Sequence, residues 1–63
     1  MTELQRVYNN MLVTLEKGLA DLEKFEDGNM SAGTRVRKTM QTVKELAQKT
    51  RVAVQEHKNA VVA

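Results

Sequence analysis

The sequence predicts an all-α fold, an antiparallel hairpin of two long helices. Three observations lead to this prediction: apolar residues recur every three or four positions in both halves, the 63 residues include no proline, and two of the three glycines lie near the middle of the chain. The first two are typical of long amphipathic helices, and the third marks a turn between them. We expect residues 1–63 to form a single domain, because a chain this short cannot build two cores.

The first helix is expected over residues of about 2 to 27. Its apolar residues are spaced by three, four and seven, which is the period of an amphipathic helix. They are Leu4, Tyr8, Met11, Leu12, Leu15, Leu19, Leu22 and Phe25. Written as heptads, one core position holds Met1, Tyr8, Leu15 and Leu22, and the other holds Leu4, Met11, Gly18 and Phe25. Only Gly18 breaks the apolar register.

A turn is expected at about residues 28 to 30. Gly28 can end the first helix in a left-handed conformation, because it has no Cβ to clash with the backbone. Asn29 or Ser31 can then cap the second helix by accepting a hydrogen bond from a backbone N–H. A connection this short places the two helices antiparallel to each other.

The second helix is expected over residues of about 31 to 60, and its apolar stripe uses smaller side chains. The stripe consists of Ala32, Val36, Met40, Val43, Ala47, Val54 and Val61, with Leu46, Ala53 and Ala60 along one edge. Thr50 and His57 are its polar members. The stripe continues the helical period of the first half, so this half is also amphipathic.

Folding the chain at the turn brings together residues whose numbers sum to about 58. Leu22 then faces Val36, Leu15 faces Val43, Met11 faces Ala47 and Leu4 faces Val54. Gly18 would lie across from Met40 and make room for its side chain, and Gly33 would contact Phe25. Because each glycine costs about 1 kcal/mol of helix propensity relative to alanine, close packing is a reason for both. For Gly33, a loosened first helical turn is the alternative.

Each apolar stripe is wider than one partner helix can cover. The chain has no cysteine, and its one histidine, His57, cannot form a metal site alone. Neither a disulfide nor a metal ion can therefore supply the stability that a small core lacks. We expect a symmetric homodimer in which two hairpins pack as a four-helix bundle, with higher oligomers as the alternative.

The charges divide the chain into two unlike halves. Residues 1–27 carry six acidic and three basic side chains, a balance of −3, whereas residues 28–63 carry seven basic and two acidic ones, a balance of +5. A basic surface gathered on one helix attracts polyanions at long range. The charge pattern therefore indicates a polyanionic partner for the second helix.

Four basic residues of the second helix form a regular row. Arg37, Lys44, Arg51 and Lys58 repeat every seven residues, and we call them the basic row; Gln41, Gln48 and Gln55 fill the positions between them. At the rise of an α-helix the row spans roughly 31 Å and can donate hydrogen bonds to phosphate oxygens. The alternative is that the row pairs with acids of the first helix, such as Glu16 and Glu23, within the dimer.

Other charges lie around this row. Arg35 and Lys38 add positive charge near the start of the helix, where free backbone N–H groups also favour an anion. No acid interrupts the row, and Glu45 is expected on the opposite flank, where it can pair with Lys49 four residues later. The two aromatic residues fall in the apolar stripe, so no stacking platform for single strands is present. A duplex backbone fits this surface better.

An enzyme is not expected. His57 is the sole imidazole, and its neighbour Glu56 projects from a different face of the helix, so acid–base or nucleophilic chemistry lacks partners. Gly28 and Gly33 have the spacing of a phosphate loop, but no Lys-Ser/Thr pair directly follows Gly33. No apolar run approaches the roughly 20 residues of a membrane span, and no signal pattern is present. We expect no catalytic residue, metal, cofactor, membrane contact or small-molecule substrate, and a cytoplasmic location.

One stretch of the sequence resembles a known family. The run from Gly28 to Lys38, GNMSAGTRVRK, followed by VKELAQK over residues 43–49 and then Arg51, is similar to the bacterial linker-histone-like proteins of the chlamydial histone-like family. That family carries approximately G-N-x-x-A-G/A-x-R-x-R-K and then a helix with K-x-L-A-x-x-x-R. The resemblance covers most of the chain. It implies a helical hairpin of the bacterial nucleoid that binds and compacts DNA with little sequence preference.

The resemblance also indicates which residues meet DNA. The basic residues that match the family pattern are Arg35, Arg37, Lys38, Lys44, Lys49 and Arg51. With Gln48 and Lys58 of the same helix they make up the expected DNA-binding set. Chlamydial members continue into a long Lys/Ala-rich tail, and because this chain stops at Ala63 we expect a short, tail-less member. Two alternatives stay open: an RNA-binding dimeric helical bundle, and an adaptor whose basic helix pairs with acidic proteins.

Overall fold

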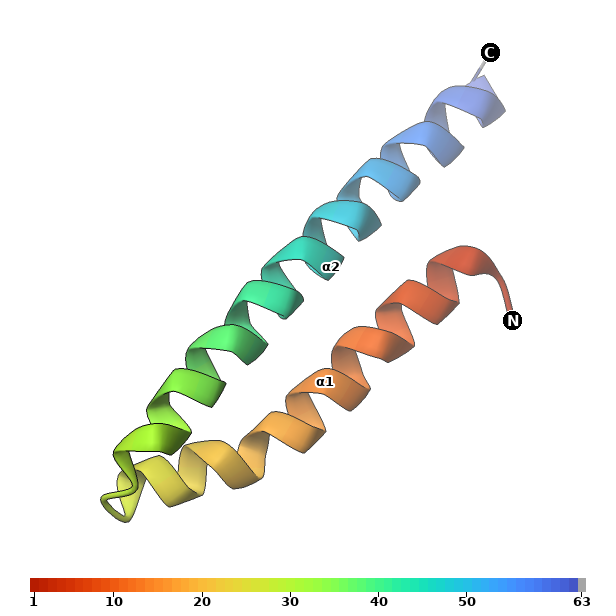
Figure 1. Ribbon diagram of the computed structural model, residues 1–63. Coiled ribbons are helices and arrows are strands. Elements are labelled where there is room, and N and C mark those ends of the chain that lie inside the picture. Colours follow the sequence, from red (N-terminus) through yellow and green to blue (C-terminus); the bar gives the residue numbers. More distant parts are fainter. Residues whose placement is uncertain (63) are drawn as a thin grey trace.

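The chain forms two long antiparallel helices joined by a tight turn (Figure 1). The computed structural model describes residues 1–62, with side chains through residue 60, so Val61 of the predicted stripe lies outside the described side chains and Ala63 outside the described residues. α1 spans Glu3–Glu26 and α2 spans Met30–Val62, and residues 1–62 contain no strand. The predicted all-α helical hairpin is confirmed, and each helix end lies within two residues of its expected position.

The first helix begins at a capping box. The side chain of Thr2 accepts a hydrogen bond from the backbone N–H of Gln5, and the side chain of Gln5 accepts one from the backbone N–H of Thr2, at 3.1 and 3.0 Å. These reciprocal bonds satisfy two N–H groups, one of them in the first helical turn, that would otherwise have no partner. The sequence therefore fixes the start of α1 locally.

The turn between the helices is a Schellman motif around Gly28. Gly28 has a φ of 101°, and its N–H donates to the carbonyl of Phe25 at 3.0 Å, while the N–H of Asn29 donates to the carbonyl of Lys24 at 2.9 Å. The side chain of Asn29 then accepts a hydrogen bond from the N–H of Ala32 at 3.2 Å. The predicted role of Gly28 is confirmed, and Asn29 is the residue that caps α2.

We predict that Gly28→Ala destabilises the fold by about 1–2 kcal/mol, because an L side chain is strained at this positive φ although the space around it is open. The midpoint of urea unfolding at a fixed protein concentration measures the loss. Gly28→Asn is the control, since asparagine tolerates positive φ better than other side chains. An alanine variant as stable as the asparagine variant would show that backbone strain does not limit this turn.

The helices approach closely at two glycines. A Cβ on Gly33 would lie 2.8 Å from Cδ1 of Phe25, so the predicted contact between these residues is confirmed. A Cβ on Gly18 would lie 2.8 Å from Cγ2 of Thr39, whereas the prediction placed Met40 across from Gly18. The prediction for Gly18 is therefore wrong by one position: the numbers of Gly18 and Thr39 sum to 57, whereas the prediction used 58.

α1 also turns a different face to α2 than the heptads suggested. The predicted core positions Tyr8, Leu15 and Leu22 are 55%, 43% and 41% exposed. Val7 and Thr14, which lie one residue before Tyr8 and Leu15, are half-buried in their place. Small and polar side chains next to Gly18 let the two backbones come close, and the larger apolar side chains are left along one edge of the contact. These three residues lie at the edge of the contact in a single hairpin, and their burial in a four-helix bundle stays a prediction.

A single hairpin has almost no interior. Among the described side chains only Ala32 is fully buried, and α1 contains no buried residue. α2 has 33 residues against 24 in α1, so its far end extends past the start of α1 (Figure 1). Within residues 1–62, neither helix has an apolar segment that would let it cross a membrane. The fold presents long surfaces, and its function has to be sought on them.

Candidate nucleic-acid interface

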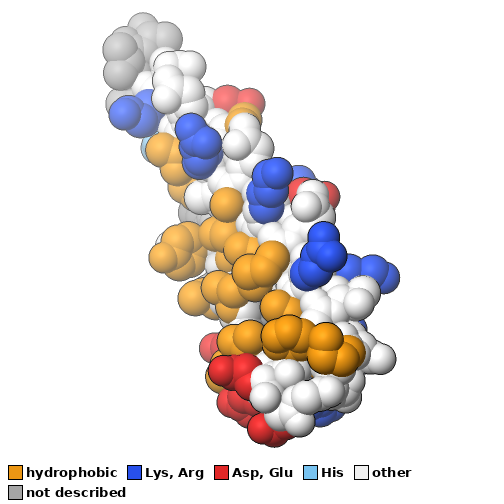
Figure 2. Space-filling view, turned by 90° about the vertical axis from the view of Figure 1, so that its left-hand side faces the viewer, with side chains coloured by type: hydrophobic (Ala, Val, Ile, Leu, Met, Phe, Trp, Pro, Cys, Tyr) orange, Lys and Arg blue, Asp and Glu red, His pale blue; other side chains and the backbone are white. Residues whose placement is uncertain are grey.

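The basic row lies along one exposed side of α2. All four side chains of Arg37, Lys44, Arg51 and Lys58 are exposed. Figure 2 shows basic side chains following one another next to an apolar patch, with acidic side chains gathered near the turn. Two ion pairs form among the described side chains, Arg6 with Glu3 and Arg35 with Asp21, and neither uses a member of the row.

Arg35 belongs to the contact between the helices. Its Nε donates to Oδ1 of Asp21 at 2.8 Å, and the two side chains are 47% and 23% exposed. This interaction links α1 to α2 one helical turn from Gly18. Because a neighbouring carboxylate already offsets the charge of Arg35, this residue offers less to a phosphate than the unpaired members of the row.

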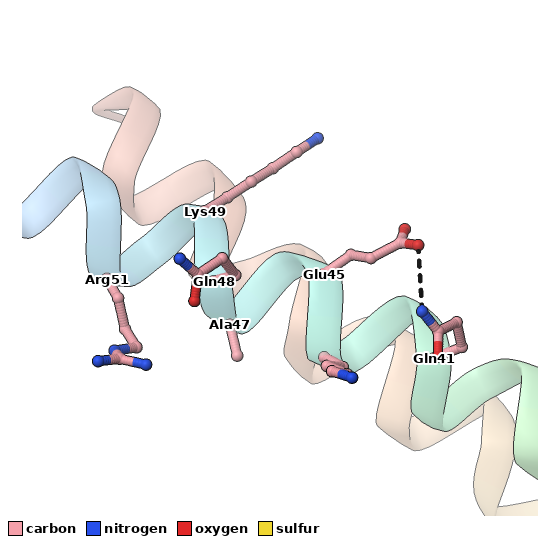
Figure 3. A pocket seen from close by; sticks show the side chains of 7 residues that line it. Gln41, Glu45, Ala47, Gln48, Lys49 and Arg51 are labelled. Carbon is pink, nitrogen blue, oxygen red and sulfur yellow. Dashed lines mark hydrogen bonds between the residues drawn. The ribbon is translucent and has the colours of Figure 1, made fainter.

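Lys38 and Lys49 lie on a different side of α2 from the row. They are eleven residues apart, which is close to three helical turns, so they share one side of the helix. Figure 3 shows the side chains of Lys49 and Arg51 leaving α2 in different directions. The expected set of eight residues therefore divides into the basic row with Gln48, the pair of Lys38 and Lys49, and Arg35 at the contact between the helices.

The side chains along the middle of α2 surround a shallow hollow on the surface of that one helix. It is lined by Gln41, Lys44, Glu45, Ala47, Gln48, Lys49 and Arg51. Glu45 accepts a hydrogen bond from the side chain of Gln41 at 3.5 Å and forms no ion pair with Lys49, so the predicted Glu45–Lys49 pair is absent (Figure 3). The hollow is open, so it suits an extended molecule that lies along α2 better than an enclosed ligand.

Two glutamines between the bases make bonds within the helix. The amide of Gln41 reaches Glu45, and the amide of Gln55 donates to Asn59 at 3.1 Å. Gln48 has no such bond among the described side chains and lies between Lys44 and Arg51, four residues after one and three before the other. Gln48 is therefore the amide best placed to act together with the row.

The row continues beyond the part of α2 that α1 covers. Since facing residues have numbers that sum to about 57, Glu3 at the start of α1 lies level with about residue 54. Lys58 is therefore on the part of α2 that extends past α1 (Figure 1). A polyanion can approach this last turn of the row from more directions than it can approach Arg37.

The geometry of the row suits contacts with phosphate groups. The row provides guanidinium and ammonium donors at a regular spacing of seven residues. No group of three or more potential metal-ligating side chains occurs within the part of the chain that the structure describes. Sequence reasoning missed the pairing of Asp21 with Arg35, although their numbers sum to 56 and the hairpin register places them at the same level.

Comparison with known proteins assigns the family. The family model described as histone H1-like protein Hc1 matches residues 5–60, which is most of the 63-residue chain and includes the basic row. No curated protein and no solved structure gives a significant match. The matched region covers nearly all of both helices and the turn between them. This helical hairpin therefore belongs to the family of histone H1-like protein Hc1.

Proposed function

We propose that this protein binds the phosphate backbone of duplex DNA with little sequence preference, as a nucleoid-associated homodimer that helps to compact the chromosome. The observation that carries the proposal is the basic row: four exposed bases at one repeat, on one side of one helix, with no ion pair to any described side chain. Membership of a histone H1-like family supports the same partner. The proposed contacts involve Arg37, Lys44, Gln48, Arg51 and Lys58 first, with Arg35, Lys38 and Lys49 adding charge around them.

The proposed contacts carry no sequence information. The bases are about 10.5 Å apart along the helix axis, and they meet phosphates, which look the same at every base pair. Phe25 packs against Gly33 near the turn and lines a groove with Arg37, and Tyr8 lies on α1. α2 itself has no Phe, Tyr or Trp, so the row as a whole has no platform for base stacking. We therefore expect similar affinity for duplexes of different sequence at the same salt concentration.

A binding titration of a labelled DNA duplex, longer than the roughly 31 Å of the row, tests the proposal. The wild-type protein should bind at low salt, and the logarithm of its affinity should fall against log salt with a slope near −3.6 for about four phosphates per engaged subunit. Unlabelled duplex DNA should compete better than duplex RNA of equal length. Equal or better competition by RNA would favour an RNA-binding bundle, and no binding even at low salt would favour a protein adaptor; either result contradicts the proposal.

A further inference from the structure

Apolar side chains that a single hairpin leaves exposed or half-buried lie along one side of both helices, and we call this surface the apolar face. It consists of Tyr8, Leu12, Leu15, Leu19 and Leu22 from α1 with Val36, Met40, Ala47 and Val54 from α2. A groove lined by Leu15, Leu19, Leu22, Val36 and Met40 shows that the contributions of the two helices lie on the same side of the hairpin. Figure 2 shows this patch beside the basic side chains.

The exposed area is of the size that a second copy would cover. The chain has an accessible surface of 5227 Å². A compact monomer of its 7.1 kDa mass exposes roughly 4,100 Å², so the excess is about 1,100 Å². A stable protein interface buries about 800 Å² on each partner. The hairpin therefore exposes more surface than a compact monomer of its mass, by about the area that one partner of its own size would cover.

Unlike charges border the two sides of the apolar face. On α1, Glu16 lies four residues after Leu12 and three before Leu19, and Glu23 lies four residues after Leu19, so both acids flank the apolar side chains. On α2, Arg37 and Lys44 stand three residues before and four residues after Met40. The face thus has an acidic edge along α1 and a basic edge along α2.

We propose that two copies pack through their apolar faces with both turns at the same end, so that α1 of each copy lies against α2 of its partner. This inference rests on the homodimer of the proposed function and specifies its arrangement. A twofold axis parallel to the helices brings each acidic edge against the partner's basic edge. The other face-to-face arrangement, with turns at opposite ends, sets acids beside acids and bases beside bases, which is unfavourable at low salt.

The register assigns individual pairs. In this arrangement residues at one level of the hairpin stay at that level in the partner, and facing numbers sum to about 57. Glu16 is then level with about residue 41, three residues from the partner's Lys44, and Glu23 is level with about residue 34, three residues from the partner's Arg37. Three residues correspond to about 4.5 Å along the axis, which these long side chains span.

The far half of the basic row is left without acids. Arg51 is level with about residue 6, where the flank of α1 carries the neutral side chains of Gln5 and Asn9. Lys58 lies on the end of α2 that extends past α1. Arg37 and Lys44 therefore serve the partner as well as the phosphates, whereas Arg51 and Lys58 are free for phosphate alone. Both extended parts of α2 project from the same end of the bundle, away from the turns.

Charge exchange across the two edges tests this arrangement by sedimentation equilibrium at low salt, without DNA. Glu16→Lys/Glu23→Lys and Arg37→Glu/Lys44→Glu should each raise the dimer dissociation constant by roughly tenfold or more, since several exposed ion pairs become repulsive. The chain carrying all four changes keeps the wild-type net charge and should recover wild-type dimerisation. Circular dichroism of each variant checks that the helices form.

A distance measurement checks the same arrangement independently. The chain has no cysteine, so Asp27→Cys carries a single spin label at the exposed turn. With both turns at one end the two labels should be less than about 25 Å apart, because packed helices are 8–10 Å apart. With turns at opposite ends the separation would exceed about 35 Å, the length of α1. As a control, the spin-labelled protein is mixed with an excess of unlabelled protein, which should remove the interaction between two labels in one dimer.

The outcomes separate this inference from the proposed DNA binding, because neither experiment contains DNA. Short label distances together with weakened dimers in both charge-reversed pairs and recovery in the fourfold variant support the arrangement. Long distances, or an unchanged dissociation constant for Glu16→Lys/Glu23→Lys, overturn it. A wild-type chain that is monomeric at micromolar concentration also overturns it and means that something other than a second copy covers the apolar face.

Discussion

A variant in which Arg37, Lys44, Arg51 and Lys58 are all changed to glutamine should lose nearly all salt-dependent affinity for duplex DNA. If the row neutralises about four phosphates per subunit, the wild-type affinity falls roughly 150-fold between 50 and 200 mM salt, and removing the row reduces the salt slope by about 3.6. Glutamine keeps helix propensity and hydrogen bonding, so α2 should stay intact. A salt-titrated binding assay on both proteins gives the slopes, and circular dichroism gives the helix content.

Arg35→Gln is the matched control for this loss. It removes the same kind of charge from the same helix, but the charge is one that Asp21 already engages at 2.8 Å. We expect a small change in the salt slope and a small loss of stability, because a partly exposed ion pair contributes about 1 kcal/mol or less. If the fourfold variant folds and binds with the wild-type slope, or if Arg35→Gln alone removes most of the slope, the row is not the DNA-binding surface.

The proposed dimer further divides the row. In the arrangement with both turns at one end, Arg51 and Lys58 meet no acid on the flank of the partner's α1 that carries Glu16 and Glu23, whereas Arg37 and Lys44 face those acids. Changing Arg51 and Lys58 should therefore lower DNA affinity without weakening the dimer. The pattern of seven-residue repeats thus combines two roles along one helix: Arg37 and Lys44, nearer the turn, serve both the partner and phosphate, and Arg51 and Lys58, nearer the far end, serve phosphate alone.

Much of the fold could be predicted because its determinants are local. A left-handed residue is needed after Asp27, only glycine adopts it without strain, and the next residue can cap α2; these facts fix the turn and the antiparallel direction. The turn determines which residues of α1 and α2 lie opposite each other, so the approach of Gly33 to Phe25 could be predicted. The end of α1 and the start of α2 follow from Gly28 and Asn29.

The rotation of α1 about its own axis could not be predicted in the same way. Tyr8, Leu15 and Leu22 have the size and period of core residues, and sequence spacing does not say which helix they will meet. Within one hairpin, close approach at Gly18 and Thr39 favours small neighbours at the contact. The larger side chains are then left for a second partner, so the heptads describe a bundle of four helices better than a pair.

The spacing of the basic residues in the candidate site could be predicted from the sequence, but which charged side chains are paired could not. The seven-residue repeat of the bases follows from the sequence, and so does their sharing of one side of α2. Whether a given base is free depends on which partner each acid has: Asp21 of α1 pairs with Arg35, whereas Glu45 bonds Gln41 of its own helix and forms no ion pair with Lys49. Long, exposed side chains choose among several partners at similar energies, so spacing alone does not select one.

Replacing Leu19 and Leu22 by glutamate should abolish the dimer and with it most of the thermal stability. The two side chains lie in the middle of the apolar face and are 54% and 41% exposed in the single hairpin. Burying what remains exposed contributes about 1 kcal/mol for each leucine, or about 4 kcal/mol for the four in a dimer, so the dissociation constant should rise about a thousandfold. Sedimentation equilibrium measures this change directly.

The same double change made elsewhere provides the control. Val13 and Val52 are 46% and 44% exposed, and their neighbours three and four residues away along the helix are all polar, so they lie off the apolar face. Val13→Glu/Val52→Glu adds the same charge and should leave the dimer intact.

A melting experiment tests the same face through stability. Because a partner that binds only the folded chain raises its melting temperature with concentration, the melting temperatures of wild type and control should rise with protein concentration. The melting temperature of Leu19→Glu/Leu22→Glu should not rise with concentration. Ala32 is the one buried residue among those that the structure describes, so a single hairpin has too little core to be stable alone. A leucine variant that melts like wild type would mean that the apolar face contributes nothing to stability.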